Sequence, residues 1–455
     1  MNLESFDLIV LGAGPVGMTL ASNSADEKIR IAVIDTPDLN ISNGFRGSNK
    51  PELKVTSLVG GSARYWGGQI AYFSHRDLVK ALALADFSIE NIDFIVNEMR
   101  ALADQLSLPF DSDNVYSNYF SEDRMLNSRQ VYSTYTASLD ISKLLGVDSL
   151  MQKRKFSLLN GKVKELQILN GLCNGLVLDD DSFVEVLPRQ TVCIALGGLG
   201  STELIMRTFP EQARKEIRPL VDHPHGYVAA FRSKKGGIFH RRTTLKIGSH
   251  VFKRKIELKS EKTDSSGIAE LHYDYFGIFF PEIICIQLSR REKLVLQINR
   301  LFLKFLRLPI ALPSLVWVWI QIEQFPDPQN TPKLGEDGRF EVSMKIGPKD
   351  LLVIEEFQSR LVSEISKGGF ELVWIATRDE IASTFTGAYH PSGSFPMNSN
   401  PKRSLVAPFG RFHNIDNLFI ASSASWTHAG WVNPTFMLMV FARLVYREIQ
   451  SYLKK

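Results

Sequence analysis

Two side chains that lie far apart in the sequence are of types that can accept a proton or donate a hydrogen bond. His390 lies beside a proline in GAYHPSGSFPM, and Asn433 lies in HAGWVNPTF. A neutral imidazole, with an ordinary pKa of ~6.5, can accept a hydroxyl proton near neutral pH. An amide can donate a hydrogen bond to an oxygen atom without taking up a proton. Taken alone, His390 is better explained as a loop histidine held by hydrogen bonds, so the surrounding motifs decide its interpretation.

The first 36 residues predict a dinucleotide site. In FDLIVLGAGPVGMTLASNSADEKIRIAVIDTPD, a short buried strand leads into a glycine-rich turn, a helix and a second strand. The turn has the pattern G-x-G-x-x-G, in which Gly12 permits the tight turn, Gly14 lets the backbone approach a pyrophosphate and Gly17 lets the helix pack closely. Asp35 ends the second strand, where a carboxylate can accept from a ribose hydroxyl. The pattern does not separate FAD from NAD.

A second glycine-rich loop occupies residues 59–69, VGGSARYWGGQ. Such a loop can lay its backbone against a flat ring, and the tryptophan at its centre argues against a flexible surface loop. The candidate ligand-contacting residues of this loop are Gly61, Ser62, Trp66, Gly67 and Gly68.

Three segments in the middle of the chain predict its organisation. TVCIALGGLGSTELI, residues 191–205, is typical of a strand, a glycine turn and a helix that begins near Ser201 or Thr202. An N-G turn at Asn170–Gly171 predicts an antiparallel hairpin. DHPHG, residues 222–226, marks a domain boundary, because long alternating strands typical of a sheet with one covered and one open face follow it.

The C-terminal segment predicts a buried strand from Leu418 to Ala421 and then a long helix. Pro434 suits the first turn of that helix, where its missing N–H costs nothing. The N-terminus of the helix would face an electron-rich group.

Composition excludes several classes of protein. The formal charge of +4 over 455 residues is too small and too scattered to indicate a nucleic-acid partner. The N-terminal residues look like the first strand of a fold, and no secretory signal is expected. Cys173, Cys193 and Cys285 form no C-x-x-C pair and are predicted to be buried thiols in a reducing, cytoplasmic setting. No metal site is predicted.

The most apolar region, residues 295–320, is interrupted by charged residues and prolines, so it does not predict a membrane span. Its first part, residues 295–308, predicts a basic amphipathic helix packed on its own domain. Peripheral contact with a membrane or a partner is the alternative.

Together these motifs resemble the glucose–methanol–choline (GMC) family of FAD-dependent oxidoreductases. The matching stretches occur in the family's order and are GAGPVG, VGGSARYWGGQ, IALGGLGSTELIM, DHPHG, YHPSGS and DNLFIASSASWTHAGWVNPTF, with WIQIEQFPDPQN at residues 319–330 as a further likeness. Residues 75–150 and 255–315 have no match. Many members have an aspartate in the stretch corresponding to ASSAS, where this chain has serines and alanines, so a flavin contact there would use hydroxyls or backbone.

The resemblance implies one FAD, bound in an extended form. The ADP half would be held by Gly12, Gly14, Gly17 and Asp35, and the backbone of Val163 would meet the adenine. The loop from Ser62 to Gly68 would lie along the flavin. The pyrophosphate, ribityl and pyrimidine part would be bordered by Ser423, Asn433 and Thr435. Because SARYW contains no histidine, the FAD is expected to be non-covalent.

The resemblance also changes the interpretation of His390, which falls on the family's catalytic histidine. Asn433 falls on the second catalytic position, so the two are expected to act as base and orienting donor. His428 is expected either to touch substrate or to lie behind a residue that does. The residues expected to be structural are His223, Trp426 and Trp431, and no role is assigned to His75, His240, His250 and His272.

The predicted fold class is α/β, with an FAD/NAD(P)-binding doubly wound (Rossmann-like) domain and a substrate domain built on an antiparallel β-sheet. The first domain is expected from residues 1–74, 151–221 and 385–455 and the second from 222–384, with 75–150 as a lid or connecting segment. The active site is expected between them.

The expected function is oxidation of an alcohol group of a small molecule, a sugar, cyclitol or other polyol, to a carbonyl. The sequence does not identify the electron acceptor, so oxidase and dehydrogenase both stay open. Two alternatives are a flavoprotein isomerase or lyase that uses the same base, and a non-catalytic FAD-binding, membrane-associated partner.

Overall fold

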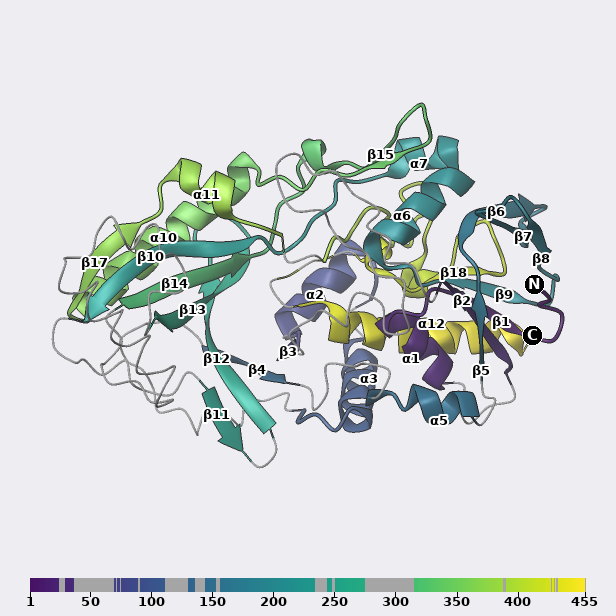
Figure 1. Ribbon diagram of the computed structural model, residues 1–455, viewed down its shortest axis with the longest axis horizontal. Coiled ribbons are helices and arrows are strands. Elements are labelled where there is room, and N and C mark those ends of the chain that lie inside the picture. The colour runs from purple at the N-terminus through teal and green to yellow at the C-terminus, as the bar shows by residue number, and fades with distance from the viewer. Residues whose placement is uncertain are drawn as a thin grey trace, which may run out of the picture.

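The computed structural model describes residues 1–23, 29–36, 69–70, 72–73, 75–88, 91–110, 130–135, 144–152, 156–233, 244–247, 250–274, 315–387, 390–426, 428, 430 and 433–454. Two main sheets lie side by side along the long axis of the molecule, and both chain termini lie near the smaller, parallel sheet (Figure 1). The predicted α/β class, with one parallel and one antiparallel sheet, is confirmed.

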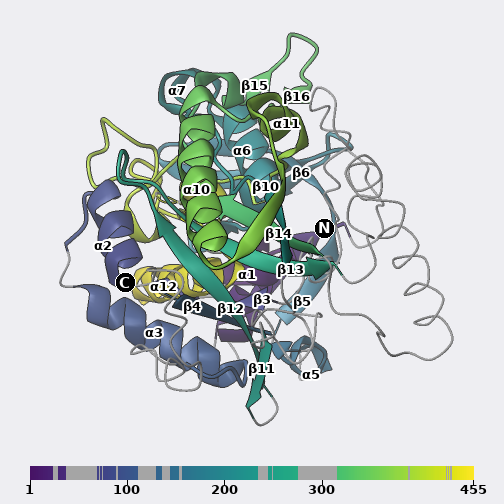
Figure 2. The same ribbon diagram turned by 90° about the vertical axis from the view of Figure 1, so that its left-hand side faces the viewer.

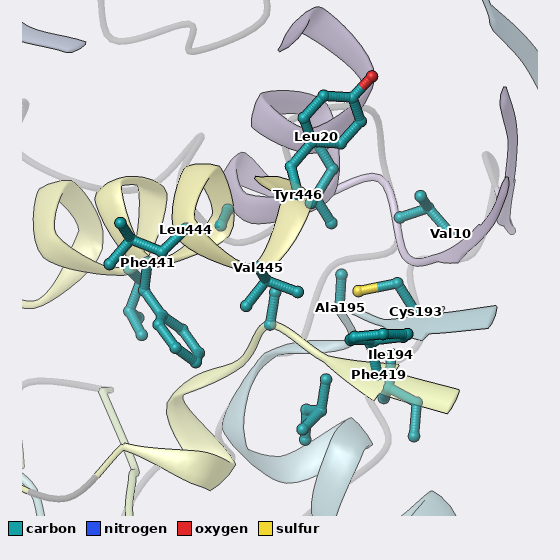
Figure 3. Close-up of a cluster of buried hydrophobic side chains, with 14 of the residues drawn as sticks. Val10, Leu20, Cys193, Ile194, Ala195, Phe419, Phe441, Leu444, Val445 and Tyr446 are labelled. Carbon is teal, nitrogen blue, oxygen red and sulfur yellow. The ribbon is translucent and has the colours of Figure 1, made fainter. Parts of the chain in front are cut away.

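The parallel sheet consists of five short strands in the order β18–β9–β1–β2–β5. Their bounds are β1 Leu8–Leu11, β2 Ile31–Asp35, β5 Phe156–Asn160, β9 Thr191–Ile194 and β18 Leu418–Ile420. β1 and β9 are buried at every position, as expected where helices cover both faces. The helices α1 (Pro15–Asn23) and α12 (Thr435–Leu453) pack together on one face, and α6 (Gly197–Thr208) lies on the other (Figure 3).

The start of α6 differs from the sequence prediction. The helix begins at Gly197 and not near Ser201 or Thr202. Gly197 has a φ of +68°, which a residue with a side chain rarely adopts, and a Cβ on Gly198 would lie 2.0 Å from the carbonyl oxygen of Pro391. Glycines therefore stand in the first turn because a neighbouring loop comes too close for any larger residue.

Apolar side chains from both helices and strands fill the core of this half (Figure 3). The strands contribute Val10, Cys193, Ile194 and Phe419, and the helices contribute Leu20, Phe441, Leu444 and Val445. Burial of each such side chain stabilises the fold by about 1.5–3 kcal/mol. Cys173 and Cys193 are free, buried thiols, as predicted, and burial raises the pKa of Cys173 to about 12. Cys285 lies outside the described residues.

The second main sheet is antiparallel and has the order β17–β10–β14–β13–β12–β4–β3, with β11 paired to β12. Its strands are β3 Gln69–Ile70, β4 Gln130–Tyr135, β10 His225–Ser233, β11 Thr244–Ile247, β12 His250–Lys259, β13 Ser266–Asp274, β14 Leu315–Ile322 and β17 Phe370–Ile375. The long helix α10 (Pro348–Lys367) crosses one face (Figure 2). Phe357 and Leu361 of this helix pack with Phe231 and Ile320 of the sheet.

Smaller elements complete the fold. They are the helices α2 His75–Leu84, α3 Ile92–Gln105, α5 Val147–Gln152, α7 Pro210–Glu216 and α11 Arg378–Thr384, the three-stranded sheet β6 Val163–Leu169, β7 Leu172–Leu178 and β8 Phe183–Glu185, and the pair β15 Lys333–Leu334 and β16 Phe340–Glu341. The predicted hairpin is confirmed, since Asn170 and Gly171 join β6 to β7 with positive φ angles of 50° and 76°.

The strands of the antiparallel sheet come from more than one segment of the chain. β3 and β4, which precede residue 150, pair with strands that follow residue 222. The domain boundaries given above stay a prediction. Among the helices that the structure describes, none combines the length and the apolar character needed to cross a membrane.

Candidate active site

The turns that follow four parallel strands meet at one edge of the parallel sheet, because parallel strands all end at the same side. The glycine turn follows β1, Asp35 ends β2, Gly197 follows β9 and Ser422 follows β18. Gly197 and Ser422 are in direct contact, since the Ser422 hydroxyl donates to the Gly197 carbonyl at 2.9 Å. Ligands of open α/β sheets bind outside this edge.

The three motif glycines are in different surroundings. A Cβ on Gly12 would lie 2.6 Å from the carbonyl oxygen of Ala195, and one on Gly17 would lie 1.9 Å from the carbonyl oxygen of Gly12. These two glycines therefore permit close packing of the turn. A Cβ on Gly14 would meet nothing within 4 Å. The backbone at Gly14 thus borders open space, as a position approached by a ligand must.

Asp35 lies beside this turn. Its Oδ2 accepts from the Ala13 amide at 2.6 Å and its Oδ1 accepts from the Thr36 amide at 2.7 Å. Asp35 pairs with Asn160 across the edge of the sheet, and Val163 begins the next strand three positions later. The structure therefore brings Gly14, Asp35 and the β5–β6 turn to one corner of the parallel sheet.

The loop that carries His390 is fixed to the turn after β18. The Ser423 hydroxyl donates to the Pro391 carbonyl at 2.9 Å, and the Gly393 amide donates to the Ser423 carbonyl at 2.9 Å. Ser423 is buried, so its hydroxyl holds the His390 loop in place. A contact of Ser423 with flavin stays a prediction.

A carboxylate of the DHPHG motif holds the backbone of His390. Both oxygens of Asp222 lie 3.2 Å from the His390 amide, and Oδ1 also accepts from the His223 amide at 2.7 Å. Burial, followed by the neighbouring rings of His223 and His225, lowers the pKa of His390 to about 3. The imidazole is therefore neutral at physiological pH. Its Nδ1 is buried and has no hydrogen-bond partner among the described residues.

The structure places His223, which the sequence analysis expects to be structural, next to His390. The two ring centres are 5.8 Å apart. The His223 ring is fully buried, and its Nδ1 lies 2.7 Å from the Gly430 carbonyl oxygen. Burial lowers the pKa of His223 to about 4. The separation of the two histidines in sequence gives no sign of this proximity.

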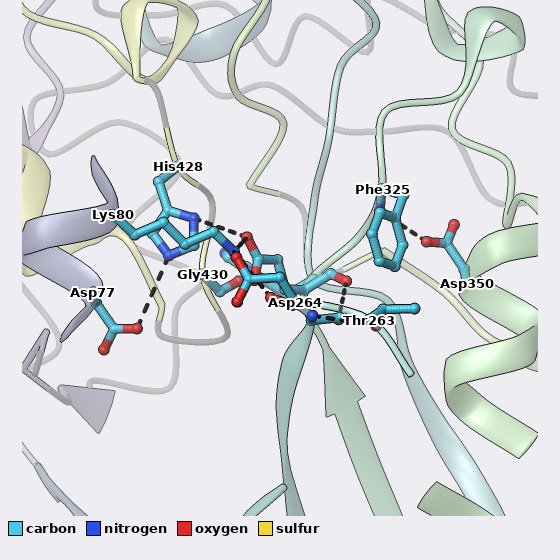
Figure 4. Close-up of polar contacts among 11 residues, drawn as sticks. Asp77, Lys80, Thr263, Asp264, Phe325, Asp350, His428 and Gly430 are labelled. Atoms are coloured by element: carbon cyan, nitrogen blue, oxygen red, sulfur yellow. Dashed lines mark hydrogen bonds and ion pairs between the residues drawn. The ribbon is translucent and has the colours of Figure 1, made fainter. Parts of the chain in front are cut away.

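His428 belongs to a network of charged side chains that joins α2 to the end of β14 (Figure 4). Its Nδ1 lies 2.8 Å from Glu323, and its Nε2 lies 3.9 Å from Asp77. Lys80 lies 3.2 Å from Glu323 and 3.4 Å from Asp264. Burial alone would lower the pKa of His428, but Asp77 and Glu323 outweigh burial and raise it.

The structure describes only some of the remaining residues that the sequence analysis names. Asn433 is half-buried and stands just before Pro434 and Thr435, where α12 begins. Trp426 is buried against Phe441 in the core, as predicted. Several predictions fall outside the described residues, namely those for Gly61, Ser62, Trp66, Gly67, Gly68, Trp431, His240 and residues 295–308.

The histidines without an assigned role also lie in identifiable places. His272 in β13 contacts the Tyr227 hydroxyl through Nδ1 at 2.8 Å and Glu270 through Nε2 at 3.0 Å. His75 is exposed at the start of α2, and His250 begins β12.

The residues present fit an extended dinucleotide. The glycine turn has open space at Gly14, a carboxylate lies beside it, and the N-terminus of α1 follows, where free N–H groups favour phosphate. The fold thus belongs to the α/β class, with a parallel sheet of the Rossmann-like kind and a second, antiparallel sheet.

Comparison with known proteins narrows this class. Residues 327–442, which include His390 and Asn433, match the family model described as GMC oxidoreductase. A 67-residue stretch is 33% identical to 6'''-hydroxyparomomycin C oxidase from Streptomyces lividus; it covers 15% of this chain and only 12% of that relative.

Solved structures share the fold over the whole chain at low identity. Pyridoxine 4-oxidase from Mesorbium loti has a TM-score of 0.62 at 12% identity, covering 98% of this chain and 99% of its own. A fungal aryl-alcohol oxidase has a TM-score of 0.61 at 11% identity, covering 99% of both chains. A formate oxidase variant from Aspergillus oryzae RIB40, studied for FAD modification, has a TM-score of 0.61 at 11% identity, covering 98% of both.

The resemblance that the motifs predict is therefore supported: residues 327–442 match the GMC oxidoreductase family model, and the solved structures share the fold of the whole chain. The family depends on FAD and oxidises alcohols or similar donors.

Proposed function

We propose that this protein oxidises an alcohol group of a sugar, cyclitol or other polyol to a carbonyl, with His390 as the base. One observation carries the proposal: the His390 imidazole is held neutral on a loop that is fixed both to Asp222 and to the turn after β18. A neutral imidazole has a lone pair for a hydroxyl proton, and the geometry of its loop is set before substrate arrives.

The two ring nitrogens of His390 have different roles in this proposal. Nδ1 is buried and has no hydrogen-bond partner among the described residues, so we assign Nε2 as the nitrogen that faces the substrate. In the neutral tautomer that carries its proton on Nδ1, the Nε2 lone pair accepts the hydroxyl proton. Asn433 donates its amide N–H to the substrate oxygen and orients the hydroxyl toward Nε2. FAD, when bound, supplies the acceptor for the carbon-bound hydride.

The cofactor is proposed to be non-covalent and to be held by the residues that the sequence analysis names. Open space at Gly14 and the carboxylate of Asp35 beside the turn support the position of the ADP half. The position of Val163 beyond the same corner supports its contact with the adenine. Precipitation of the protein with acid tests the linkage, because non-covalent FAD stays in the supernatant and covalent flavin sediments with the protein.

The class of substrate is supported by the face of the antiparallel sheet that α10 does not cover. This face combines polar and aromatic groups, with Trp319 stacked on His272 and the buried pair Lys255–Glu270 beside them. Aromatic rings next to hydrogen-bonding groups suit a hydroxylated ring. The relative named for oxidation of 6'''-hydroxyparomomycin C agrees with a hydroxylated donor.

The test is anaerobic mixing of the FAD-loaded enzyme with alcohols and sugars, followed by loss of flavin absorbance. His390→Ala is expected to slow this bleaching by about 10²–10⁴-fold and to keep a normal ratio of flavin to protein. The matched control is His75→Ala, which removes an exposed histidine of α2 and leaves the rate unchanged. Normal single-turnover bleaching in His390→Ala would overturn the role of His390. Repeating the assay with oxygen separates an oxidase from a dehydrogenase.

A further inference from the structure

The proposed base and two side chains next to it have the composition of a metal site, although the sequence predicts none. They are Asp222, His223 and His390, and one ligand atom from each lies within 4.8 Å of the other two. Two come from adjacent positions before β10 and the third from a loop near the C-terminus, so their spacing in sequence matches no metal-binding motif.

The tautomer of His223 makes one lone pair available. A carbonyl oxygen only accepts, so the contact with Gly430 requires that Nδ1 of His223 carries the proton. Nε2 therefore has a free lone pair. This atom is buried and lacks a hydrogen-bond partner among the described residues. A histidine ligand in metalloproteins is usually fixed in this way, with the second ring nitrogen donating to a backbone carbonyl.

His390 and Asp222 complete the set. Nδ1 of His390 is a second buried ring nitrogen without a partner in the described part of the chain. The Asp222 carboxylate is buried and is oriented by the amides of His223 and His390. The site thus offers two imidazole nitrogens and one carboxylate oxygen, and backbone groups orient the carboxylate and the His223 ring.

We propose that Asp222, His223 and His390 bind a divalent transition-metal cation, with Zn²⁺ as its best representative. Two imidazoles and a carboxylate favour zinc and its neighbours, whereas magnesium and calcium prefer an all-oxygen set. Ligand atoms around tetrahedral zinc, at ~2.0–2.1 Å from the metal, lie about 3.4 Å apart. Binding therefore needs the three ligand atoms, now within 4.8 Å of one another, to approach by at most about 1.4 Å, and it leaves a fourth position for water.

Metal binding has a consequence for catalysis that depends on the proposed function. A cation on Nδ1 of His390 needs the lone pair of that nitrogen, so the ring proton moves to Nε2. Nε2 then has no lone pair for a substrate hydroxyl. The bound cation is therefore an inhibitor that locks the base in the wrong tautomer.

The test is direct binding of Zn²⁺ to the FAD-loaded enzyme, measured by calorimetry after chelator treatment. We expect one Zn²⁺ per chain in the wild type. The control variant His75→Gln, which changes an exposed histidine of α2, is expected to bind the same amount. His223→Gln is expected to weaken binding at least 10-fold, with the flavin spectrum as a check on its folding. No binding to the wild type, or equal binding to His223→Gln, would overturn the site.

A second measurement needs no variant. Wild-type crystals soaked with Zn²⁺ are expected to show anomalous scattering at the zinc edge between the three side chains, and a peak elsewhere alone counts against the site. Inhibition of flavin bleaching by Zn²⁺, reversed by a chelator, tests the consequence for catalysis. Binding without inhibition keeps the metal site and counts against His390 as the base, so the two proposals fail separately.

Discussion

The backbone amide of His390 donates to both carboxylate oxygens of Asp222, at 3.2 Å each, across 168 positions of sequence. The same carboxylate accepts from the His223 amide, and a Cβ on Gly387 would lie 2.5 Å from its Oδ2. One buried carboxylate therefore connects the segment that leads into β10 with the backbone of His390, and it lies close against Gly387.

Loss of this carboxylate is expected to misplace the loop. Asp222→Ala leaves the His390 and His223 amides without their acceptor, which costs about 1–3 kcal/mol for buried donors. The expected result is a lower free energy of unfolding in urea and flavin bleaching slowed by more than about tenfold, because small displacements of a catalytic group are costly.

Asp104→Ala is the control for this prediction. It removes an exposed carboxylate in the last turn of α3, and it is expected to change neither the free energy of unfolding nor the rate of flavin bleaching. If Asp222→Ala retained both the stability and the bleaching rate of the wild type, the loop would not depend on this carboxylate.

Alanine substitutions at two glycines of the N-terminal turn are expected to cause different defects. Gly17→Ala places a methyl group 1.9 Å from the Gly12 carbonyl oxygen, so the turn must shift, and both stability and FAD content are expected to fall. Gly14→Ala meets no atom of the chain within 4 Å. It is expected to leave the stability of the flavin-free protein unchanged and to lower FAD content, because the methyl group occupies the side approached by the pyrophosphate.

The ratio of flavin to protein absorbance and the unfolding of the flavin-free proteins measure these effects. Each glycine variant serves as the control of the other. Full FAD occupancy in Gly14→Ala would show that the pyrophosphate does not approach the backbone at this position.

The two histidines of the site are expected to make the protein less stable as the pH falls. Their pKa values are about 4 for His223 and about 3 for His390 in the folded chain, against ~6.5 in an unfolded chain. Below pH ~6.5 the unfolded chain binds protons that the folded chain does not, so stability is lost as the pH falls toward 4. At pH 5 each group is expected to reduce stability by about 2 kcal/mol relative to pH 7.5.

His428, in the charged network, has the opposite dependence on pH, whereas its partner Glu323 does not. The raised pKa of His428 adds stability that is fully present below the unfolded value of ~6.5 and is lost as the pH rises through the folded value. Burial alone would raise the pKa of Glu323, but His428 and Lys80 lower it. The stabilisation by Glu323 is therefore fully present above the unfolded-chain pKa of ~4.5, and it is lost as the pH falls through the pKa in the folded chain.

Urea unfolding at pH 5 and pH 7.5 measures these contributions. His223→Gln is expected to show a smaller loss of stability between pH 7.5 and pH 5 than the wild type. His428→Gln is expected to destabilise the protein more at pH 5 than at pH 8.5. Identical pH profiles for the wild type and both variants would contradict the assigned pKa directions.

The sequence by itself determined the features that local signals encode. The run of apolar residues predicted β1 and β9, the G-x-G-x-x-G turn predicted the helix that follows it, and the N-G pair predicted the β6–β7 hairpin. These depend on backbone geometry and on the periodicity of burial within a few residues. The order of the motifs also predicted a resemblance to the family whose model matches residues 327–442.

Only the tertiary structure decided which side chains surround the proposed base. It placed His223 against His390, used the Ser423 hydroxyl to hold Pro391, and put His428 in a network with Asp77 and Glu323. The physical reason is that each of these contacts joins elements brought together by sheet pairing and core packing. No period or spacing along the chain encodes a distance between such elements.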